Sequence, residues 1–238
     1  CEACHGPSGD HAGRVRRGQE RPAPAITFKA GDAASLEDRN GACLGCHEAN
    51  TGFGWHGSSH DEDSVACVDC HSSHVASDPV LVTATQPEVC FDCHQRQRTQ
   101  SFKPYAHPIR QGQMACTGCH SPHGATSEWQ FARQTLNETC FDCHAEKRGP
   151  YLWEHAPVVE DCSNCHDPHG SNHPGMLTMR GPMLCQSCHS QAGHPSIAND
   201  ADGLPEAMPS QFLLGQNCMN CHTQSHGSNH PSGSRLMR

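Results

Sequence analysis

The sequence predicts an elongated chain of mostly irregular loops and short α-helices, with little or no β-sheet, organised by something other than an apolar core. Three observations support this prediction. Hydrophobic residues make up 34% of the 238 residues, against roughly 45–50% in ordinary globular domains. Glycine and proline contribute 22 and 17 residues, which favours turns over long helices. The chain also carries 18 cysteines and 21 histidines, and small cysteine-dense chains are usually held together by cross-links or bound metals.

The charge of the chain argues against nucleic-acid binding, and its hydropathy argues against a transmembrane helix. The formal net charge is −9 at pH 7 with histidine neutral. Nucleic-acid binding needs a basic face, so no nucleic-acid partner is expected. No run of residues approaches the roughly 18 apolar residues of a transmembrane helix, so the sequence predicts no transmembrane segment of its own. Residues 1–238 are predicted to form a single domain because one repeat runs through all of them.

The repeat is the motif Cys-x-x-Cys-His, which occurs nine times and uses all 18 cysteines. Successive copies start 42, 24, 23, 26, 24, 22, 23 and 33 residues apart. Repetition at a nearly fixed period indicates one structural unit per repeat. The pairs of motif cysteines are Cys1 and Cys4, Cys43 and Cys46, Cys67 and Cys70, Cys90 and Cys93, Cys116 and Cys119, Cys140 and Cys143, Cys162 and Cys165, Cys185 and Cys188, and Cys218 and Cys221.

Cys-x-x-Cys-His is the attachment signature of c-type haem. The two thiols form thioethers with the haem vinyl groups, and the adjacent histidine reaches the iron from one face. We therefore predict nine covalently attached haem c groups in this chain. The predicted proximal iron ligands are His5, His47, His71, His94, His120, His144, His166, His189 and His222.

Other uses of paired cysteines explain the pattern less well. Zinc ribbons also use Cys-x-x-Cys pairs, but they do not require a histidine after every second cysteine. A disulfide framework would leave the histidines without a role. Thioredoxin-like redox motifs do not come in ninefold arrays, and iron–sulfur proteins use other cysteine spacings.

Two kinds of site alternate along the chain. A typical A site, such as CTGCHSPHG from Cys116, has a trailing histidine three residues after the motif histidine and a leading histidine seven to nine residues before its first cysteine. A typical B site, such as CFDCHAEKR from Cys140, lacks the trailing histidine. The A sites start at Cys1, Cys67, Cys116, Cys162 and Cys218, and the B sites start at Cys43, Cys90, Cys140 and Cys185.

The alternation gives a two-site period of about 45–50 residues. An array that begins and ends on an A site has one unpaired A site at its start. We therefore expect a further B site upstream of Cys1, which would complete five B–A pairs and bring the total to ten haems.

Each iron needs a second axial ligand unless it keeps an open position for catalysis. Twelve histidines lie outside the motifs, which suffices for nine haems without methionine, so we predict bis-histidine ligation throughout. His56 and His173 each lie four residues from a better-placed histidine and are predicted to be spares, either at the surface or in contact with a haem propionate. Without an open iron the chain is predicted to be an electron carrier and not an enzyme, whereas a five-coordinate haem would indicate a multihaem reductase. The candidate distal ligands are His11, His60, His74, His107, His123, His155, His169, His194, His226 and His230.

With these sites in view, the sequence resembles the MtrA/PioA/MtoA/DmsE family of decahaem c-type cytochromes. The stretches that carry the resemblance are CEACHGPSGDH from Cys1, CFDCHAEKRGPYLWEHAPVVEDCSNCHDPHG from Cys140, and CMNCHTQSHGSNHPSG from Cys218. Members of the family carry ten haems, all with two histidine ligands, and their first motif precedes a segment like CEACHG.

The resemblance implies a function that spacing alone does not. Such cytochromes are exported to the periplasm and lie at the outer membrane, inserted into a porin-like β-barrel protein that insulates the haem wire. Extracellular electron transfer is then expected, for metal reduction or Fe(II) oxidation, with an extracellular multihaem cytochrome and periplasmic electron carriers as further partners. The competing interpretation is a soluble periplasmic electron shuttle or a subunit of an extracellular cytochrome filament.

Overall fold

The computed structural model describes residues 1–29, 31, 33–48, 54–189, 218–220, 222–231 and 233–236. Two predicted site residues, His194 and Cys221, lie outside these ranges. The chain divides into two compact units, one formed by Cys1–Asp92 with Ala115–Ala132 and the other by Cys93–Met114 with Arg133–Arg238. The expectation of a single domain over residues 1–238 stays a prediction.

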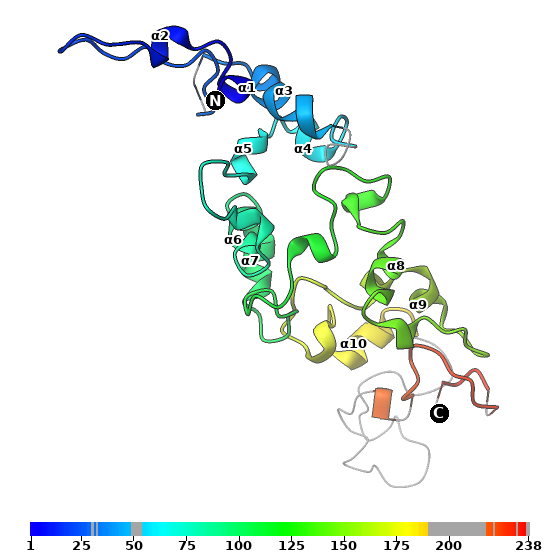
Figure 1. Cartoon of the computed structure of the whole chain (residues 1–238). Coiled ribbons are helices and arrows are strands. Elements are labelled where there is room, and N and C mark those ends of the chain that lie inside the picture. Colours follow the sequence, from blue (N-terminus) through cyan, green and yellow to red (C-terminus); the bar gives the residue numbers. More distant parts are fainter. Residues whose placement is uncertain are drawn as a thin grey trace. The chain divides into compact units, whose positions relative to one another are not determined.

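The first unit is built from short helices joined by long loops (Figure 1). Ser35 starts the longest of them, because its hydroxyl accepts the backbone N–H of Asp38 at 3.0 Å, which satisfies a donor that the first helical turn leaves free. The helices of this unit are α1 (Glu2–His5), α2 (Gly9–Ala12), α3 (Leu36–His47), α4 (Ser59–Glu62), α5 (Cys67–Cys70), η1 (Pro79–Leu81), α6 (Gln86–Phe91), η2 (Cys116–Gly118) and η3 (Glu128–Gln130), where η marks a 3₁₀ helix.

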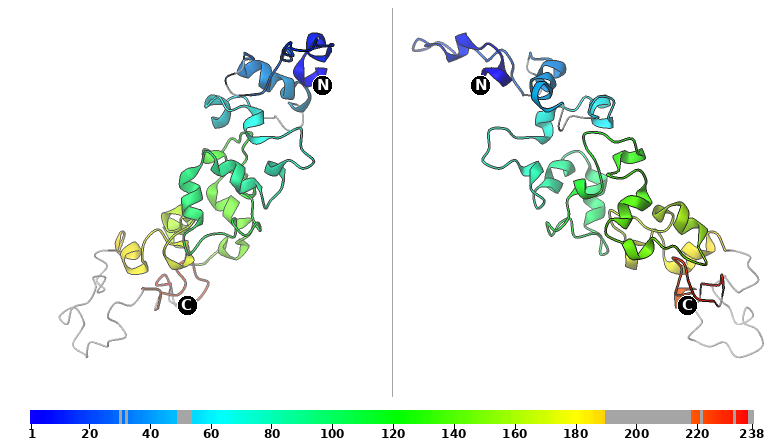
Figure 2. Two further views of the ribbon diagram at one scale, coloured as in Figure 1. Left: turned by 90° about the vertical axis from the view of Figure 1, so that its left-hand side faces the viewer. Right: turned by 45° about the vertical axis from the view of Figure 1, so that its right-hand side comes forward.

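The second unit is built in the same way, and Figure 2 shows its short helices from two further sides. Thr135 caps α8 through a hydrogen bond from the N–H of Glu138 to its hydroxyl at 3.1 Å. The helices are α7 (Gln95–Ser101), α8 (Leu136–Phe141), η4 (Ala145–Lys147), α9 (Ala156–Glu160), η5 (Cys162–Asn164), η6 (Pro174–Met176), α10 (Gly181–Gln186) and η7 (Cys218–Asn220).

Strand pairing is limited to isolated β-bridges in the described part of the chain, which contains no β-strand. The predicted fold class of short helices and loops without a sheet is therefore confirmed. The bridges are of two kinds, and both kinds occur at more than one A site. Two bridges join a segment beside a leading histidine to a distant loop, and two join a motif histidine to the loop that follows it. They are Tyr105 with Ser171, Trp153 with Ser228, His120 with Phe131, and His166 with Leu177.

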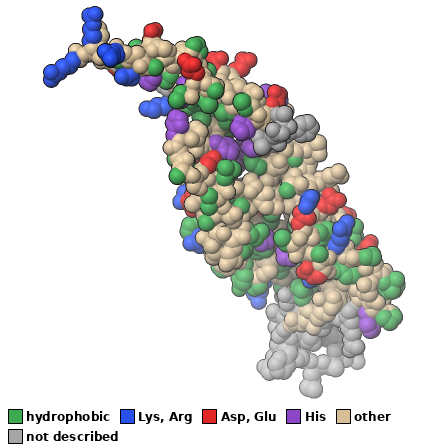
Figure 3. All heavy atoms as spheres, in the orientation of Figure 1, with side chains coloured by type: hydrophobic (Ala, Val, Ile, Leu, Met, Phe, Trp, Pro, Cys, Tyr) green, Lys and Arg blue, Asp and Glu red, His purple; other side chains and the backbone are tan. Residues whose placement is uncertain are grey.

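Side-chain packing contributes little to either unit. Among the described residues, the buried hydrophobic side chains are those of Trp55, Ala66 and Phe91. Large apolar side chains such as those of Leu81 and Trp129 are 73% exposed, and hydrophobic side chains are dispersed over the face in Figure 3. A chain with so small an apolar core needs another source of order, such as bound groups. In the described ranges, no helix has the length and apolar character needed to span a bilayer.

Candidate haem sites

Seven of the nine motifs close a helical turn at their histidine. In seven motifs the backbone N–H of the histidine donates to the carbonyl of the first cysteine at 2.8–3.0 Å, which is the hydrogen bond of an α-helical turn. The turn places both thiols and the imidazole on one short stretch of backbone, as thioether attachment and iron ligation from one face require. The histidines in these seven turns are His5, His71, His120, His144, His166, His189 and His222.

The two kinds of site differ in where the motif lies on its helix. The B-site cysteines Cys90 and Cys140 lie in the last turn of α6 and α8. The A-site cysteines Cys116 and Cys162 are instead the first residues of η2 and η5. A B site therefore ends a helix and the following A site begins one.

The first cysteine of each B site lies against the first cysteine of the A site that follows it. Burial is the main reason why the pKa of the Cys67 thiol is raised to about 11, and electrostatic repulsion from Cys43 is the second reason. The hydrogen bond from Cys140 lowers the pKa of Cys162. The paired thiols show that the two attachment points of each B–A pair lie side by side. The four pairs are Cys43 with Cys67, Cys90 with Cys116, Cys140 with Cys162, and Cys185 with Cys218.

A side-chain amide fixes the spacing of three of these B–A pairs, a role that the sequence analysis missed. Asn137 in α8 accepts the N–H of Cys162 at 2.7 Å and donates to the carbonyls of Val158 and Val159, both at 3.1 Å. Asn40 in α3 does the same for the A site at Cys67, accepting from its N–H at 3.0 Å and donating to the Val65 carbonyl at 3.2 Å. Gln86 in α6 plays the equivalent part by accepting the N–H of Thr117 at 3.0 Å. The amide three or four residues before the B-site cysteine was the available sequence signal.

Replacing Asn137 by alanine is expected to destabilise the haem-loaded protein by about 1–3 kcal/mol, because the N–H of Cys162 and two carbonyls lose their partner. Asn137→Asp keeps the acceptor for the Cys162 N–H but turns a carboxylate oxygen toward the two carbonyls, so it too should be less stable than the parent. Gln111→Ala, at an exposed loop position, is the control. Chemical unfolding followed by circular dichroism measures all three, and equal stability of Asn137→Ala and the control would contradict the assignment.

Three leading histidines form hydrogen bonds to carbonyls more than 60 residues further along the chain. The ring Nδ1 of His107 bonds the carbonyl of Pro168 at 2.9 Å, and that of His155 bonds the carbonyl of Ser225 at 2.8 Å. In the first unit, His60 bonds the carbonyl of Pro122 at 2.9 Å in the same way. Each acceptor directly precedes a trailing histidine. An Nδ1 that is bonded in this way leaves Nε2 as the nitrogen available to a metal.

Five pairs of imidazoles face each other with their ring centres 5.9–6.4 Å apart. Each pair contains one motif histidine and one candidate distal histidine. The pairs are His5 with His74, His71 with His123, His144 with His107, His189 with His155, and His166 with His226.

This spacing fits two axial ligands of one iron. With metal–nitrogen bonds of about 2 Å on either side, two imidazoles trans to each other on a metal have ring centres about 6 Å apart. Rings in direct contact would lie closer together. Burial lowers the pKa of His226, which favours the neutral imidazole that binds metal ions. The residues present therefore fit haem iron at these five positions.

The pairs follow two rules. A motif histidine of an A site pairs with the trailing histidine of the next A site, as His71 does with His123. A motif histidine of a B site pairs with the leading histidine of the preceding A site, as His144 does with His107. Sequence analysis named these candidates but did not assign them to individual irons.

The other candidate ligands are described by their local surroundings. His11 bonds the carbonyl of Pro22 through Nδ1 at 2.6 Å. The backbone of His169 donates to Asp167 at 3.2 Å and that of His230 donates to Ser228 at 3.1 Å. The expected spare His56 is 68% exposed and lies 3.7 Å from Asp61, whereas the second spare, His173, is half-buried.

No disulfide links the seventeen cysteines within the described ranges. Over the same ranges, no group of three or more His, Cys, Asp or Glu side chains is placed to hold a metal ion. The imidazoles instead occur in facing pairs with ring centres 5.9–6.4 Å apart, a spacing that would accommodate an iron between the two rings.

Comparison with known proteins agrees with this geometry. The family model "Doubled CXXCH motif" matches residues 56–99, 107–149 and 155–194. The multihaem cytochrome MtrA of Shewanella baltica (strain OS185) is 48% identical over 240 residues, covering 100% of this chain and 70% of its own length. The chain belongs to the MtrA-like family of multihaem c-type cytochromes. The cytochrome c-type protein NrfB of Escherichia coli O6:H1 (strain CFT073) is 31% identical over 116 residues, covering 46% of this chain and 56% of NrfB.

Membership in the MtrA-like family identifies the cofactor that the paired motifs bind. The motif cysteines bind haem c covalently, and the chain transfers electrons through several such groups. The alternation of B and A sites corresponds to the doubled motif of the family model. The structure adds to this which histidines stand opposite each other.

Proposed function

We propose that the chain is an electron conduit whose nine haem c groups are all held between two histidines. The observation that carries this proposal is the set of five facing imidazole pairs; each pair would supply both axial ligands of one iron. When bound, haem c supplies reversible one-electron chemistry at the iron. With both axial positions taken by protein side chains, no substrate can coordinate, so the chain acts as a carrier and not as an enzyme.

The residues of the chain prepare each position for rapid electron transfer. Hydrogen bonds from Nδ1 fix the tautomer and orientation of a ligand, as at His107 and His155, so little rearrangement accompanies a change in iron charge. The first cysteines of adjacent B and A sites lie side by side, as Cys140 and Cys162 do, which brings neighbouring attachment points close together. About 26 residues per site leave little polypeptide to separate neighbouring macrocycles, and short distances between them favour electron hopping.

The proposed setting is the outer membrane. The family resemblance supports an exported periplasmic protein that is inserted into a porin-like β-barrel partner and carries electrons across the lipid. The donors and acceptors would be periplasmic electron carriers on one side and an extracellular multihaem cytochrome, a mineral or ferrous iron on the other. A soluble periplasmic shuttle and a filament subunit are the alternatives.

Spectroscopy of the resting protein tests the carrier assignment. We expect electron paramagnetic resonance of the fully oxidised, haem-loaded chain to show low-spin ferric haem only, with nine haems per chain by mass spectrometry. Bis-histidine ligation at every site produces this result because two strong-field nitrogen ligands keep ferric iron low-spin. A high-spin signal amounting to one haem per chain would contradict it and favour a multihaem reductase.

Isolation from native membranes tests the setting. Affinity purification of the full chain from detergent-solubilised outer membranes should recover a β-barrel protein in a one-to-one ratio. Recovery of the chain from the soluble periplasmic fraction alone, or as a homopolymer, would overturn the conduit proposal and support the shuttle or the filament respectively.

A further inference from the structure

The hydrogen-bond acceptor of the motif histidine differs at one A site. At the other four A sites, Nδ1 of the motif histidine faces a backbone carbonyl at 2.6–3.0 Å. At the A site of Cys67, Nδ1 of His71 instead faces the carboxylate of Asp78, with an Nδ1–Oδ2 distance of 2.8 Å. The four carbonyl acceptors belong to Ile26, Trp129, Gly175 and Arg235.

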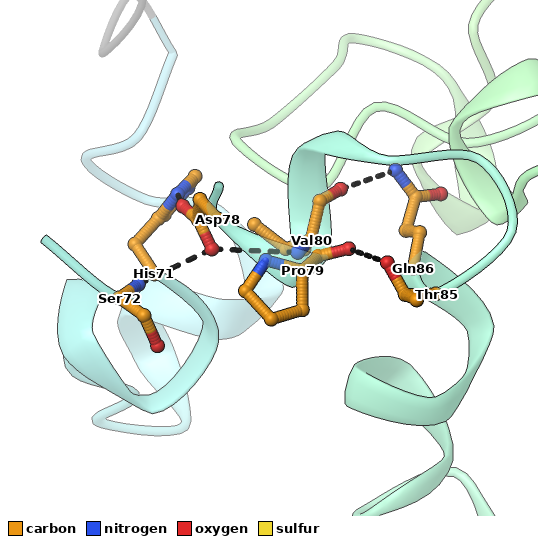
Figure 4. A network of polar contacts seen from close by, with 7 residues as sticks. All are labelled: His71, Ser72, Asp78, Pro79, Val80, Thr85 and Gln86. Atoms are coloured by element: carbon orange, nitrogen blue, oxygen red, sulfur yellow. Dashed lines mark hydrogen bonds and ion pairs between the residues drawn. The ribbon is translucent and has the colours of Figure 1, made fainter. Parts of the chain in front are cut away.

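The carboxylate of Asp78 is held in place from several sides (Figure 4). Its second oxygen, Oδ1, accepts the backbone N–H of Ser72 at 3.2 Å and that of Val80 at 3.4 Å, so it also caps η1. The side chain of Asp78 is 14% exposed and that of His71 is 37% exposed. The geometry therefore fixes the contact between carboxylate and imidazole, unlike a mobile ion pair at the surface.

The loop that presents Asp78 is itself anchored. The hydroxyl of Thr85 donates to the carbonyl of Pro79 at 2.7 Å, and the amide of Gln86 donates to the carbonyl of Val80 at 2.8 Å. Gln86 is buried and also accepts the N–H of Thr117 at 3.0 Å. The carboxylate is thus attached to the B–A pair that follows it along the chain, which keeps it beside His71.

Asp78 differs from the four carbonyl acceptors in its charge, because a carboxyl group is ionised near neutral pH. Two backbone N–H groups face its Oδ1 and the imidazole of His71 faces its Oδ2. An ionised carboxylate beside a ligating histidine makes the metal-bound nitrogen more basic than a neutral carbonyl does. A more basic ligand stabilises ferric iron over ferrous iron, and hydrogen bonding around an axial ligand is one of the means by which a protein sets a haem potential.

We propose that Asp78 is a positioning residue that acts through His71 to give the haem at Cys67 and Cys70 the lowest reduction potential of the five A sites. This inference rests on the proposed binding of haem iron between His71 and His123, whose ring centres lie 5.9 Å apart. The asymmetry makes one point along an otherwise repeating conduit more difficult to reduce. Electron flux through the first unit would then depend on one carboxylate.

The test compares Asp78→Asn with the parent chain, both fully loaded with haem. Asparagine keeps the size of the side chain and an oxygen that can accept from Ser72 and Val80, but it removes the charge and turns an NH2 group, which cannot accept a hydrogen bond, toward Nδ1 of His71. In a potentiometric titration followed by electron paramagnetic resonance, we expect one low-spin component to move to a more positive midpoint and the others to stay in place. Asp63→Asn removes an exposed charge at the end of α4 and should move none.

Two further measurements separate tuning from a merely structural role. Asp78→Glu retains the carboxylate and should return the shifted component toward its original midpoint. The hyperfine-shifted proton resonances of one ligating imidazole should also change in Asp78→Asn and not in Asp63→Asn. Unchanged midpoints with a full haem complement would overturn the inference, and so would loss of one haem in Asp78→Asn, which would assign Asp78 to folding or attachment. A parent chain whose haem at Cys67 is not low-spin would instead refute the proposed function itself.

Discussion

Replacing Gly170 by alanine should destabilise the second unit by about 3 kcal/mol or more, one of the largest losses that a single added methyl group can cause. Gly170 is buried and has a φ of +138°, a backbone conformation that side chains strongly disfavour. A Cβ at this position would overlap the carbonyl of Gln100 and approach the Cβ of Ala106 to 3.1 Å. Neither group can move freely, because Tyr105 and Ser171 exchange backbone hydrogen bonds of 3.1 and 2.8 Å beside them.

The loss should extend to the haem site. Where the two backbone segments meet at Gly170, His107 reaches the carbonyl of Pro168. The ring centre of His107 lies 6.4 Å from that of His144. Separating the two segments would therefore weaken one axial ligand as well as the fold. The measurements are the midpoint of thermal unfolding and the low-spin absorption of the oxidised protein.

Gly175→Ala is the matched control for Gly170→Ala. Gly175 also has a positive φ, of +68°, but a Cβ there would meet no atom within 4 Å. The control measures the conformational part alone, which is about 1 kcal/mol. If the two variants unfold at the same temperature, the close approach of the two backbone segments does not contribute to stability.

The local structure of each site could be predicted from the sequence because the information is itself local. A Cys-x-x-Cys-His motif closes one helical turn, as in the bond of 2.8 Å from the His71 N–H to the Cys67 carbonyl. The low content of apolar residues correctly predicted short helices without a sheet. It also predicted that few hydrophobic residues would be buried, and Trp55 and Phe91 are among those few.

The pairing of histidines could not be read from the sequence because it depends on contacts between distant segments. The hydrogen bond of His107 spans 61 residues and that of His155 spans 70. Ten candidates for nine irons leave many assignments equally compatible with local spacing. The close approach of two backbone segments at a glycine such as Gly170 determines which histidines can face each other. No local sequence pattern reveals this approach, although a HisGly pair follows the A motif at Gly124, Gly170 and Gly227.

Polar residues outside the motifs were missed for a related reason. Asn137 and Asp78 are common residue types at positions where a capping or surface role is the ordinary expectation. Their contacts, with Cys162 and His71 respectively, become visible only once the turn of the motif places a backbone N–H or a ring nitrogen beside them. Comparing the five A sites with one another is what shows that Asp78 is exceptional.

Replacing His226 by methionine should raise the midpoint potential of one haem on the order of 100 mV, within the roughly 0.8 V range that axial ligands span. His226 faces His166 with ring centres 6.0 Å apart and an angle of 10° between the rings. A thioether is a weaker donor to ferric iron than an imidazole, so histidine–methionine ligation favours the ferrous state. Potentiometry and near-infrared magnetic circular dichroism, which distinguishes methionine from histidine ligation, would measure the change.

The control for His226→Met is His56→Met, at a histidine that is 68% exposed beside Asp61. This variant should leave every midpoint and every ligand signature unchanged. If His226→Met behaves like the control, His226 is not an axial ligand. If one haem becomes high-spin instead, His226 is an axial ligand and the methionine does not bind the iron in its place. His166 belongs to the A site at Cys162, and His226 belongs to the next A site, at Cys218. A shift confined to one haem would therefore also support the rule that an A site supplies a ligand to the preceding A site. The same rule would then account for the pairs of His5 with His74 and of His71 with His123.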